Sequence, residues 1–304
     1  MLKKGDKVAF VSPSSWLDEK SLEYAVAWFE NQGFKVVLSK HIFDVDGYCA
    51  GTPLNRAKDI NSAFEDKGIK AIFCSRGGAG SLKVLPYLDY DLIKKNPKPV
   101  FGFSDSTALQ NALYTKAGMT SYTGFLPAYD IKTSEVNQVL EKSLTGVFQA
   151  KPLVEKKFEI FNSGEAEGVL IGGCLSVFTS LCGTDYMPDL KDKILLLEDV
   201  GEKTYRIDLM LEQLKQQPHF DGVKGIIFGI FEKCMPADEG DEQIKEILQK
   251  FALSVDIPVF YNLDYGHVQK RVIMPIGARV KMSSSTSTIQ KLDDKNQNLS
   301  AKSV

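Results

Sequence analysis

The sequence has few of the residues that metal sites and disulfide frameworks require. Five cysteines and three histidines are spread over 304 residues. The number of cysteines is odd and no Cys-x-x-Cys pair occurs, which favours reduced thiols and excludes a zinc framework of the usual spacing. We therefore expect no metal site.

The sequence also lacks a strong net charge and a long apolar run. Lys and Arg number 37 against 39 Asp and Glu, a net charge of −2, so no overall field attracts nucleic acid or an anionic membrane. The most apolar stretch, Gly225–Phe231, is far shorter than the ~20 residues that cross a bilayer. The basic first residues run directly into a strand-like segment, Val8–Val11, without an apolar signal region. We expect a cytoplasmic protein.

The composition that remains is that of an ordinary globular protein, with 43% apolar and 25% charged residues. The length suits two domains of about 150 residues each. A less periodic, Lys-rich region marks the boundary. We predict a first domain over 1–145, a linker over 146–165 and a second domain over 166–304.

Both halves alternate short β-branched or aromatic runs with segments of helical period, which predicts an α/β fold with parallel sheets. Ser- and Gly-rich turns follow the strands of the first half, at the sheet edge where such folds bind ligands. The tail, 283–304, is expected to form an edge strand at best and to fray. The expected strands are Val8–Val11, Lys35–Leu38, Ala71–Cys74, Pro99–Phe103, Glu167–Ile171, Ile194–Leu197, Gly225–Ile230 and Pro258–Tyr261. The expected helices are Leu17–Gln32, Leu54–Glu65, Ser134–Thr145, Leu175–Leu181, Arg206–Gln216 and Asp241–Phe251.

One of these turns imitates a nucleophile elbow. Ser104 follows a buried strand and precedes a helix, with the small residues Gly102 and Ser106 on either side. Small residues let strand and helix approach closely, and the helix N-terminus favours developing negative charge. The alternative is that Ser104 and Asp105 only cap the helix.

A catalytic serine needs a base, and the candidates are His41, His219 and His267. His267 lies in a loop after a predicted strand, whereas His219 follows a proline in a helix-ending turn and His41 begins a polar loop. The alternative for a lone loop histidine is a solvated side chain.

A strand ending in a carboxylate supplies a candidate acid to orient the histidine. Glu198 ends the apolar run Ile194–Leu197 and is a better candidate than Asp199. The alternative is that Glu198, Asp199 and Glu202 cap the helix that follows.

Together these motifs resemble the LD-carboxypeptidase family of serine peptidases, which includes muramoyl-tetrapeptide carboxypeptidases and microcin-C immunity hydrolases. The resemblance extends over nearly the whole chain. Its carriers are Gly5-Asp6, Ser12-Pro13-Ser14, Ala50-Gly51-Thr52, Arg56-Ala57, Arg76-Gly77-Gly78, Gly102-Phe103-Ser104-Asp105, Gly172-Gly173, Leu197-Glu198-Asp199-Val200-Gly201-Glu202, Tyr205-Arg206-Ile207-Asp208 and Gly266-His267.

The resemblance implies a triad of Ser104 as nucleophile, His267 as base and acid, and Glu198 as the residue that orients His267. It implies a flavodoxin-like or amidotransferase-like N-terminal domain, a smaller C-terminal α/β domain, and an active site between them. It also implies a homodimer and no cofactor.

Beside this triad, the backbone N–H groups of Gly77 or Gly78 and of Asp105 are candidate oxyanion donors, because glycine lets a peptide approach the substrate. A tight β–α turn is their alternative role. Arg76 could bind a substrate carboxylate or tie the two domains together.

Four positions depart from the family pattern. Ala79 stands where an aromatic residue is usual, Cys174 where Asn is common, and Thr123 and Phe125 where His and Pro are common. A missing ring removes stacking area, which Tyr122 or Phe125 would have to replace.

The expected function is removal of the terminal D-alanine from muropeptide tetrapeptides, at the bond between the L-centre of diaminopimelate and D-alanine, in peptidoglycan recycling. The alternatives are a microcin-C-type immunity hydrolase that cleaves aminoacyl-sulfamoyl nucleotides, and a catalytically silent muropeptide-binding protein. The expected partners are a peptide substrate and a second copy of the chain, with neither nucleic acid nor membrane.

Overall fold

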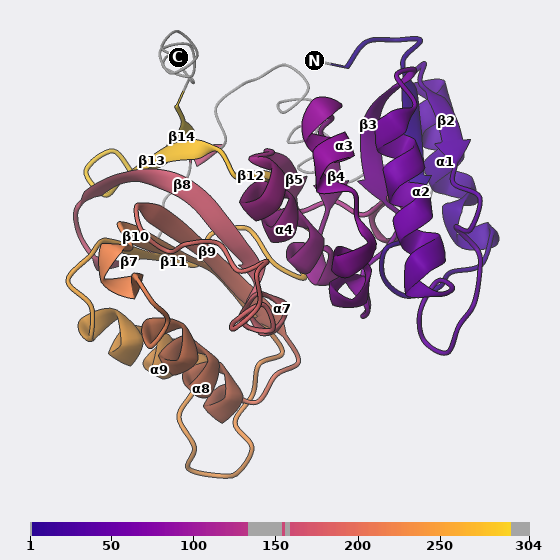
Figure 1. The fold of residues 1–304 in the computed structure, drawn as a ribbon. Coiled ribbons are helices and arrows are strands. Elements are labelled where there is room, and N and C mark those ends of the chain that lie inside the picture. The colour runs from indigo at the N-terminus through magenta and orange to yellow at the C-terminus, as the bar shows by residue number, and fades with distance from the viewer. Residues whose placement is uncertain (1, 133–153, 156–158, 293–304) are drawn as a thin grey trace, which may run out of the picture.

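A computed structural model describes residues 2–132, 154–155 and 159–292. Two sheets with helices packed on them account for most of these residues, one sheet drawn chiefly from each half of the chain (Figure 1). The predicted α/β class, with parallel strands in both halves, is confirmed.

The first sheet contains six strands in the order β12-β5-β4-β3-β1-β2. Five of them are parallel, and their order, β2-β1-β3-β4-β5, is that of a flavodoxin-like sheet. The sixth, β12, pairs antiparallel with β5. The strands are β1 (Lys7–Val11), β2 (Lys35–Leu38), β3 (Ile69–Cys74), β4 (Val100–Gly102), β5 (Ser121–Thr123) and β12 (Met274–Ile276).

Helices cover both faces of this sheet because alternate residues of each strand point to opposite sides. In β1, Val8 and Phe10 pack in one apolar cluster with Phe29 of α1, whereas Ala9 packs in another with Ile60 of α2. The elements are α1 (Lys20–Asn31), α2 (Pro53–Glu65), α3 (Tyr90–Lys95), α4 (Thr107–Ala117), α5 (Pro127–Asp130) and the 3-10 segments η1 (Ser81–Tyr87) and η2 (Ser104–Ser106).

The second sheet contains eight strands in the order β6-β14-β13-β8-β9-β10-β11-β7. The strands β8 to β11 are mutually parallel, and the flanking strands run antiparallel to their neighbours. The strands are β6 (Val154–Glu155), β7 (Glu159–Asn162), β8 (Glu165–Cys174), β9 (Lys193–Val200), β10 (Gly225–Glu232), β11 (Val259–Tyr261), β13 (Arg279–Ser283) and β14 (Thr288–Lys291).

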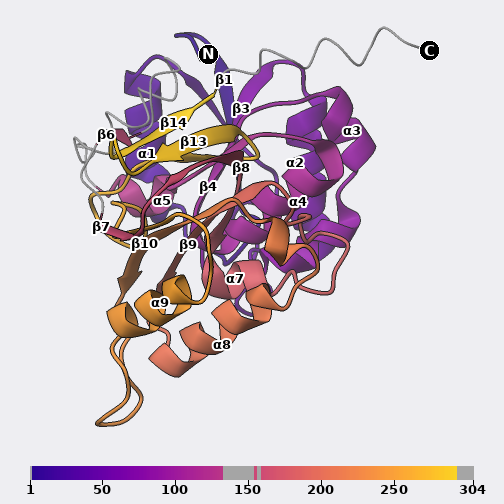
Figure 2. The ribbon, with the colours of Figure 1, turned by 90° about the vertical axis from the view of Figure 1, so that its left-hand side faces the viewer.

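Two amphipathic helices lie side by side next to this sheet, α8 (Thr204–Lys215) and α9 (Ile244–Leu253), as Figure 2 shows. A capping box between Gln243 and Glu246 starts α9 by satisfying backbone N–H groups at its first turn. The shorter α7 (Leu175–Thr179) follows β8 directly, and a 3-10 turn, η3 (Phe220–Gly222), precedes β10.

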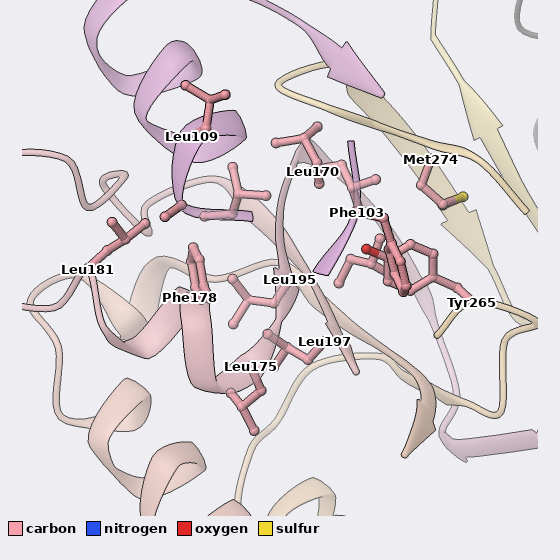
Figure 3. Packing of buried hydrophobic residues seen from close by; sticks show 14 of the residues in the cluster. Phe103, Leu109, Leu170, Leu175, Phe178, Leu181, Leu195, Leu197, Tyr265 and Met274 are labelled. Atoms are coloured by element: carbon pink, nitrogen blue, oxygen red, sulfur yellow. The ribbon is translucent and has the colours of Figure 1, made fainter. Parts of the chain in front are cut away.

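The two halves share one apolar core, in which Phe103 and Leu109 of the first half belong to the same cluster as Phe178 and Leu195 of the second (Figure 3). Hydrogen bonds between the two halves also fix how they are oriented in this packing. The side chain of Asn111 on α4 accepts from the Gly172 N–H at 3.0 Å and donates to the Gly172 carbonyl at 2.8 Å. The middle of α4 is thereby held against the C-terminal part of β8.

All eight predicted strands are present, with small shifts at their ends. The strands β5, β6, β7, β12 and β13 were not predicted. They have two to five residues each, too few to show a clear period. The tail holds β14, which pairs on both sides rather than forming an edge. The predicted helix Ser134–Thr145 and most of the predicted linker, 146–165, lie outside the described residues, and the domain limits stay predictions.

Candidate active site

Ser104 occupies a sharp turn between β4 and α4. Its φ of 61° lies in the left-handed region, a conformation that stores about 1–3 kcal/mol in a residue other than glycine. The turn is tight enough that a Cβ at Gly102 would lie 2.7 Å from the Cβ of Ser106. The strand–turn–helix geometry of a nucleophile elbow is therefore present around Ser104.

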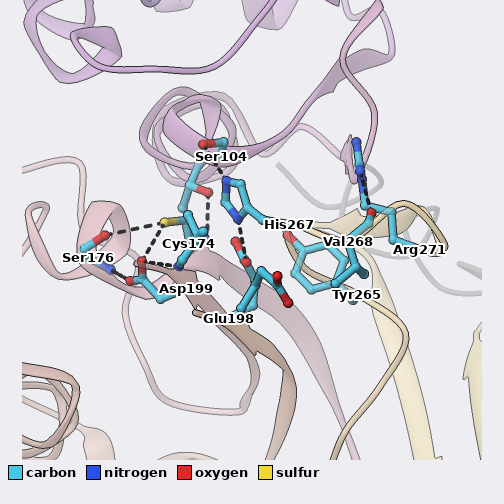
Figure 4. Close-up of polar contacts among 12 residues, drawn as sticks. Ser104, Cys174, Ser176, Glu198, Asp199, Tyr265, His267, Val268 and Arg271 are labelled. Carbon is cyan, nitrogen blue, oxygen red and sulfur yellow. Dashed lines mark hydrogen bonds and ion pairs between the residues drawn. The ribbon is translucent and has the colours of Figure 1, made fainter. Parts of the chain in front are cut away.

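The structure brings Ser104, His267 and Glu198 together in one hydrogen-bonded chain (Figure 4). The Nε2 atom of His267 is 3.0 Å from Oγ of Ser104, and its Nδ1 atom is 2.9 Å from Oε2 of Glu198. The side chain of His267 is 15% exposed and that of Glu198 is fully buried. This arrangement can remove a proton from the serine hydroxyl while the carboxylate stabilises the resulting imidazolium.

Glu198 is fully buried in β9, after the apolar residues Ile194–Leu197 and before the buried Asp199. Burial raises the pKa of Glu198, while the hydrogen bond and charge of His267 oppose the rise. Its second oxygen, Oε1, has no hydrogen-bond partner. The carboxylate therefore has His267 as its one hydrogen-bond partner among the residues that the structure describes.

Asp199, the rival acid, faces elsewhere. Its Oδ2 accepts from the Ser176 N–H at 2.7 Å and its Oδ1 from the Val200 N–H at 2.8 Å. Asp199 therefore supports the start of α7, which precedes it in the chain. The alternative that Glu198, Asp199 and Glu202 together cap the following helix is wrong for Asp199, which on that side accepts only from Val200 among the described residues. Glu202 is the residue that accepts from Arg206 in α8.

The candidate oxyanion loop lies against the nucleophile. A Cβ at Gly77 would be 3.0 Å from Oγ of Ser104, so only glycine fits there. The carboxylate of Asp105 accepts from the N–H groups of Gly80 and Ser81 at 3.3 and 2.8 Å. Asp105 directly follows the nucleophile Ser104. Its two hydrogen bonds therefore hold the turn that includes Gly78 close to Ser104.

Two family models match this chain. The N-terminal domain model of LD-carboxypeptidases matches residues 8–124, and the C-terminal domain model matches residues 167–282. The chain belongs to the LD-carboxypeptidase family. As a member of this family it is an enzyme, a serine carboxypeptidase.

Similar proteins align over nearly the full length. A probable murein peptide carboxypeptidase of Bacillus subtilis is 33% identical over 297 residues, with 94% of this chain and 92% of that protein covered. A murein tetrapeptide carboxypeptidase of Pseudomonas aeruginosa is 29% identical over 281 residues, with coverages of 89% and 91%.

The microcin C7 self-immunity protein MccF of Escherichia coli is 27% identical over 319 residues, with coverages of 94% and 92%. A solved structure of MccF in complex with glutamyl sulfamoyl guanosine has a TM-score of 0.86 at 24% identity, with coverages of 96% and 97%. This last likeness concerns the fold alone.

Arg76 immediately precedes Gly77 in the chain and is partly exposed. Its Nη1 donates to the Trp16 carbonyl at 2.8 Å, which joins two loops of the first half of the chain. Binding of a substrate carboxylate by Arg76 stays a prediction.

The positions that depart from the family pattern have different surroundings. Ala79 is exposed beside the oxyanion loop, and Cys174 is buried with its Sγ 3.7 Å from Asp199. Phe125 is fully buried against Phe73 in the core, so the suggestion that it replaces a ring in the pocket wall is wrong.

Thr123 is buried as well, and its hydroxyl lies 2.8 Å from that of Tyr265. Tyr265 and Phe103 were not singled out from the sequence, although each lies within two residues of the triad. Their rings pack edge to face with centroids 5.7 Å apart, and the Phe103 ring also lies 4.6 Å from the imidazole of His267. Their proximity in sequence to His267 and Ser104 was the signal that could have identified Tyr265 and Phe103.

The other two histidines have acidic partners of their own. Nδ1 of His41 is 2.9 Å from Asp44, and Nδ1 of His219 is 2.9 Å from Asp189. Within the described ranges, no group of three or more His, Cys, Asp or Glu side chains could hold a metal ion. The same residues include no helix with the length and apolar character needed to cross a membrane.

Proposed function

We propose that this enzyme releases the terminal D-alanine from muropeptide tetrapeptides, by cleaving the bond between the L-centre of diaminopimelate and D-alanine. The observation that carries the proposal is the pair of hydrogen bonds from His267 to Ser104 and Glu198, at 3.0 and 2.9 Å. The name of the P. aeruginosa relative, a murein tetrapeptide carboxypeptidase, supports this substrate class.

In the first half of the reaction, Oγ of Ser104 attacks the carbonyl carbon as His267 takes its proton. The backbone N–H groups of Gly77 or Gly78 and of Asp105 stabilise the oxyanion. The intermediate collapses when the C–N bond breaks and His267 passes its proton to the leaving amine of D-alanine.

In the second half, water attacks the acyl group on Ser104. His267 accepts the proton of the water and returns it to Oγ of Ser104 as the ester bond breaks. Glu198 holds the imidazole in the required tautomer throughout. The products are the tripeptide, with a new carboxylate, and free D-alanine.

The second candidate is hydrolysis of an aminoacyl-sulfamoyl nucleotide, and the similarity to MccF favours it. The hydrogen-bonded triad is suited to both acyl transfers, so the substrate pocket must distinguish them. In the amino-acid sequence, no inserted loop with aromatic platforms for a nucleobase is evident, which favours the peptide. The same triad argues against a protein that only binds muropeptides.

The deciding experiment incubates the enzyme with a diaminopimelate-containing tetrapeptide and, separately, with an aminoacyl-sulfamoyl adenosine, and weighs the products. We expect loss of one alanine residue from the peptide. Cleavage of the nucleotide alone would establish the second candidate, and cleavage of neither would contradict both.

We propose further that the enzyme acts in peptidoglycan recycling in the cytoplasm as a homodimer with two domains, 1–145 and 166–304. Light scattering of the purified chain tests the dimer. Cell fractionation tests the location, and accumulation of tetrapeptide in a deletion strain tests the pathway.

A further inference from the structure

His267 lies on a segment that crosses from one sheet to the other. The segment leaves the eight-stranded sheet at Tyr261, the end of β11, and enters the six-stranded sheet at Met274, the start of β12. No helix or strand forms between these residues. A single parallel bridge pairs Gly266 with Ile230 of β10, and the Ile230 N–H donates to the Tyr265 carbonyl at 2.8 Å. Because no ladder continues past Gly266, contacts on its C-terminal side must complete the positioning of His267.

Arg271 supplies several such contacts from within the same segment. Its side chain is fully buried, and its Nη1 donates to the Val268 carbonyl at 2.8 Å (Figure 4). Its Nε donates to the Gly124 carbonyl at 2.8 Å, and its Nη2 lies 2.5 Å from both carboxylate oxygens of Asp130. The guanidinium therefore bonds the crossing segment to two sites in the first half of the chain.

The same guanidinium packs on a ring that also touches the catalytic histidine. The Cζ atom of Arg271 is 4.6 Å from the centroid of the Phe103 ring, and the imidazole of His267 is 4.6 Å from that centroid. Phe103 immediately precedes Ser104. Arg271, His267 and the nucleophile thus share one packing neighbour.

We infer that Arg271 is a positioning residue for the reaction: by binding Asp130, Gly124 and Val268, it holds His267 within hydrogen-bonding reach of Ser104. The inference rests on the proposed roles of Ser104 and His267. Its energetic basis is the steep distance dependence of acyl transfer, where a displacement of about 1 Å can reduce the rate about 10²-fold. The planar fork of arginine suits the task, because one side chain reaches three separate acceptors.

If Arg271 contributed only to stability, any variant that regains the stability would also regain the activity. A buried ion pair is weak evidence for stability, and an apolar pair of similar volume is often as stable. Removal of one partner is destabilising because the other charge is left buried. The double variant Asp130→Leu/Arg271→Met should therefore regain the melting temperature that each single variant loses.

The two roles separate in the activity of that double variant, because Arg271 also holds Gly124 and Val268. The experiment compares the wild type with Arg271→Met, Asp130→Leu, their double variant and Arg271→Lys. Arg279→Met is the matched control. Arg279 is 55% exposed, and its ion pair with Glu167 is long, at 3.9 Å. The readouts are melting temperature, kcat and KM for the tetrapeptide, and the rate at which a fluorophosphonate labels Ser104.

We expect Arg271→Met to lower kcat and the labelling rate about 10- to 100-fold, with KM changed less than about twofold. The double variant should regain melting temperature but keep the low kcat and slow labelling. Arg271→Lys should keep most of the stability and lose about tenfold in kcat. The control should match the wild type throughout.

The inference is overturned if Arg271→Met labels and turns over like the wild type, or if the double variant regains rate together with stability. If the double variant stays unstable, Arg271→Lys decides: wild-type rates overturn the inference, and slow rates at near-normal melting temperature support it. Labelling needs no peptide, so a wild type that is labelled at Ser104 but releases no D-alanine contradicts the proposed substrate and leaves this test valid.

Discussion

The Nε2 atom of His267 lies 3.0 Å from Oγ of Ser104, although 163 residues separate them in the chain. Ser104 follows a strand of the six-stranded sheet, and His267 sits where the chain passes between the two sheets. The distance between base and nucleophile therefore depends on how the two halves of the chain pack. Contacts between the halves, such as Asn111 with Gly172, are part of the active-site geometry.

Ser104→Ala should leave the fold intact and abolish hydrolysis. The hydroxyl is the nucleophile, so we expect kcat to fall by about four to six powers of ten. Turnover of the tetrapeptide and melting temperature measure the two effects. Ser180→Ala, which removes an exposed hydroxyl bonded to the Val177 carbonyl, is the control. Near-normal turnover by a folded Ser104→Ala enzyme would end the serine mechanism.

His267→Ala should fail almost as completely, because His267 is hydrogen-bonded to the nucleophile. His41→Ala and His219→Ala should retain activity within about twofold, since each of those rings bonds to an aspartate of its own. The measurement is kcat/KM for all three variants. Equal losses in all three would refute the assignment of the base.

Glu198→Gln should lower kcat by about two to four powers of ten with KM little changed, because the amide no longer stabilises the imidazolium. Asp199→Asn should cost less in kcat and more in melting temperature, since Asp199 accepts from Ser176 and Val200. Both quantities are measured for both variants. The reverse pattern would mean that Asp199 is the catalytic acid.

The difference in stability between Glu198→Gln and the wild type should depend on pH. Burial raises the pKa of Glu198 above its ordinary 4.5, so the native state binds this proton more tightly than the unfolded state does. The stabilisation from this carboxyl is complete below pH 4.5 and is lost as the pH rises through the folded-state pKa. Relative to the wild type, Glu198→Gln should therefore gain melting temperature as the pH rises above 4.5.

Thermal unfolding at several pH values checks this expectation. Glu167→Gln is the control, because Glu167 is exposed and its substitution removes a carboxylate that lies outside the triad. A difference between Glu198→Gln and wild type that does not vary with pH would contradict the raised pKa.

The features of the fold and the site that could be predicted depend on residues that are close together in the sequence. The small residues Gly102 and Ser106 mark the turn around Ser104, and four consecutive apolar residues mark the strand that carries Glu198. Steric limits on the backbone and burial of a strand act over a few residues, so they can be read from order alone. Motif similarity then paired Ser104 with Glu198 and His267.

The contacts that could not be predicted join distant segments. Asp199 binds the start of α7 rather than its own downstream helix, Phe125 enters the core, and β12 crosses to the first sheet. The bond between Arg271 and Asp130 spans 141 residues. Such contacts depend on how the two sheets pack against each other. They could not be predicted because many pairings of distant residues are compatible with the same local sequence pattern.

By itself, the sequence determined the class of fold, the elbow at Ser104 and the family to which the triad belongs, because local sterics, periodicity and motif order suffice for these. Only the tertiary structure decided how close Glu198 and Ser104 lie to His267 and which contacts surround His267. The physical reason is that a hydrogen bond is sensitive to differences of a few tenths of an ångström. Distances of that precision arise only when both sheets, their shared core and the crossing segment are in place.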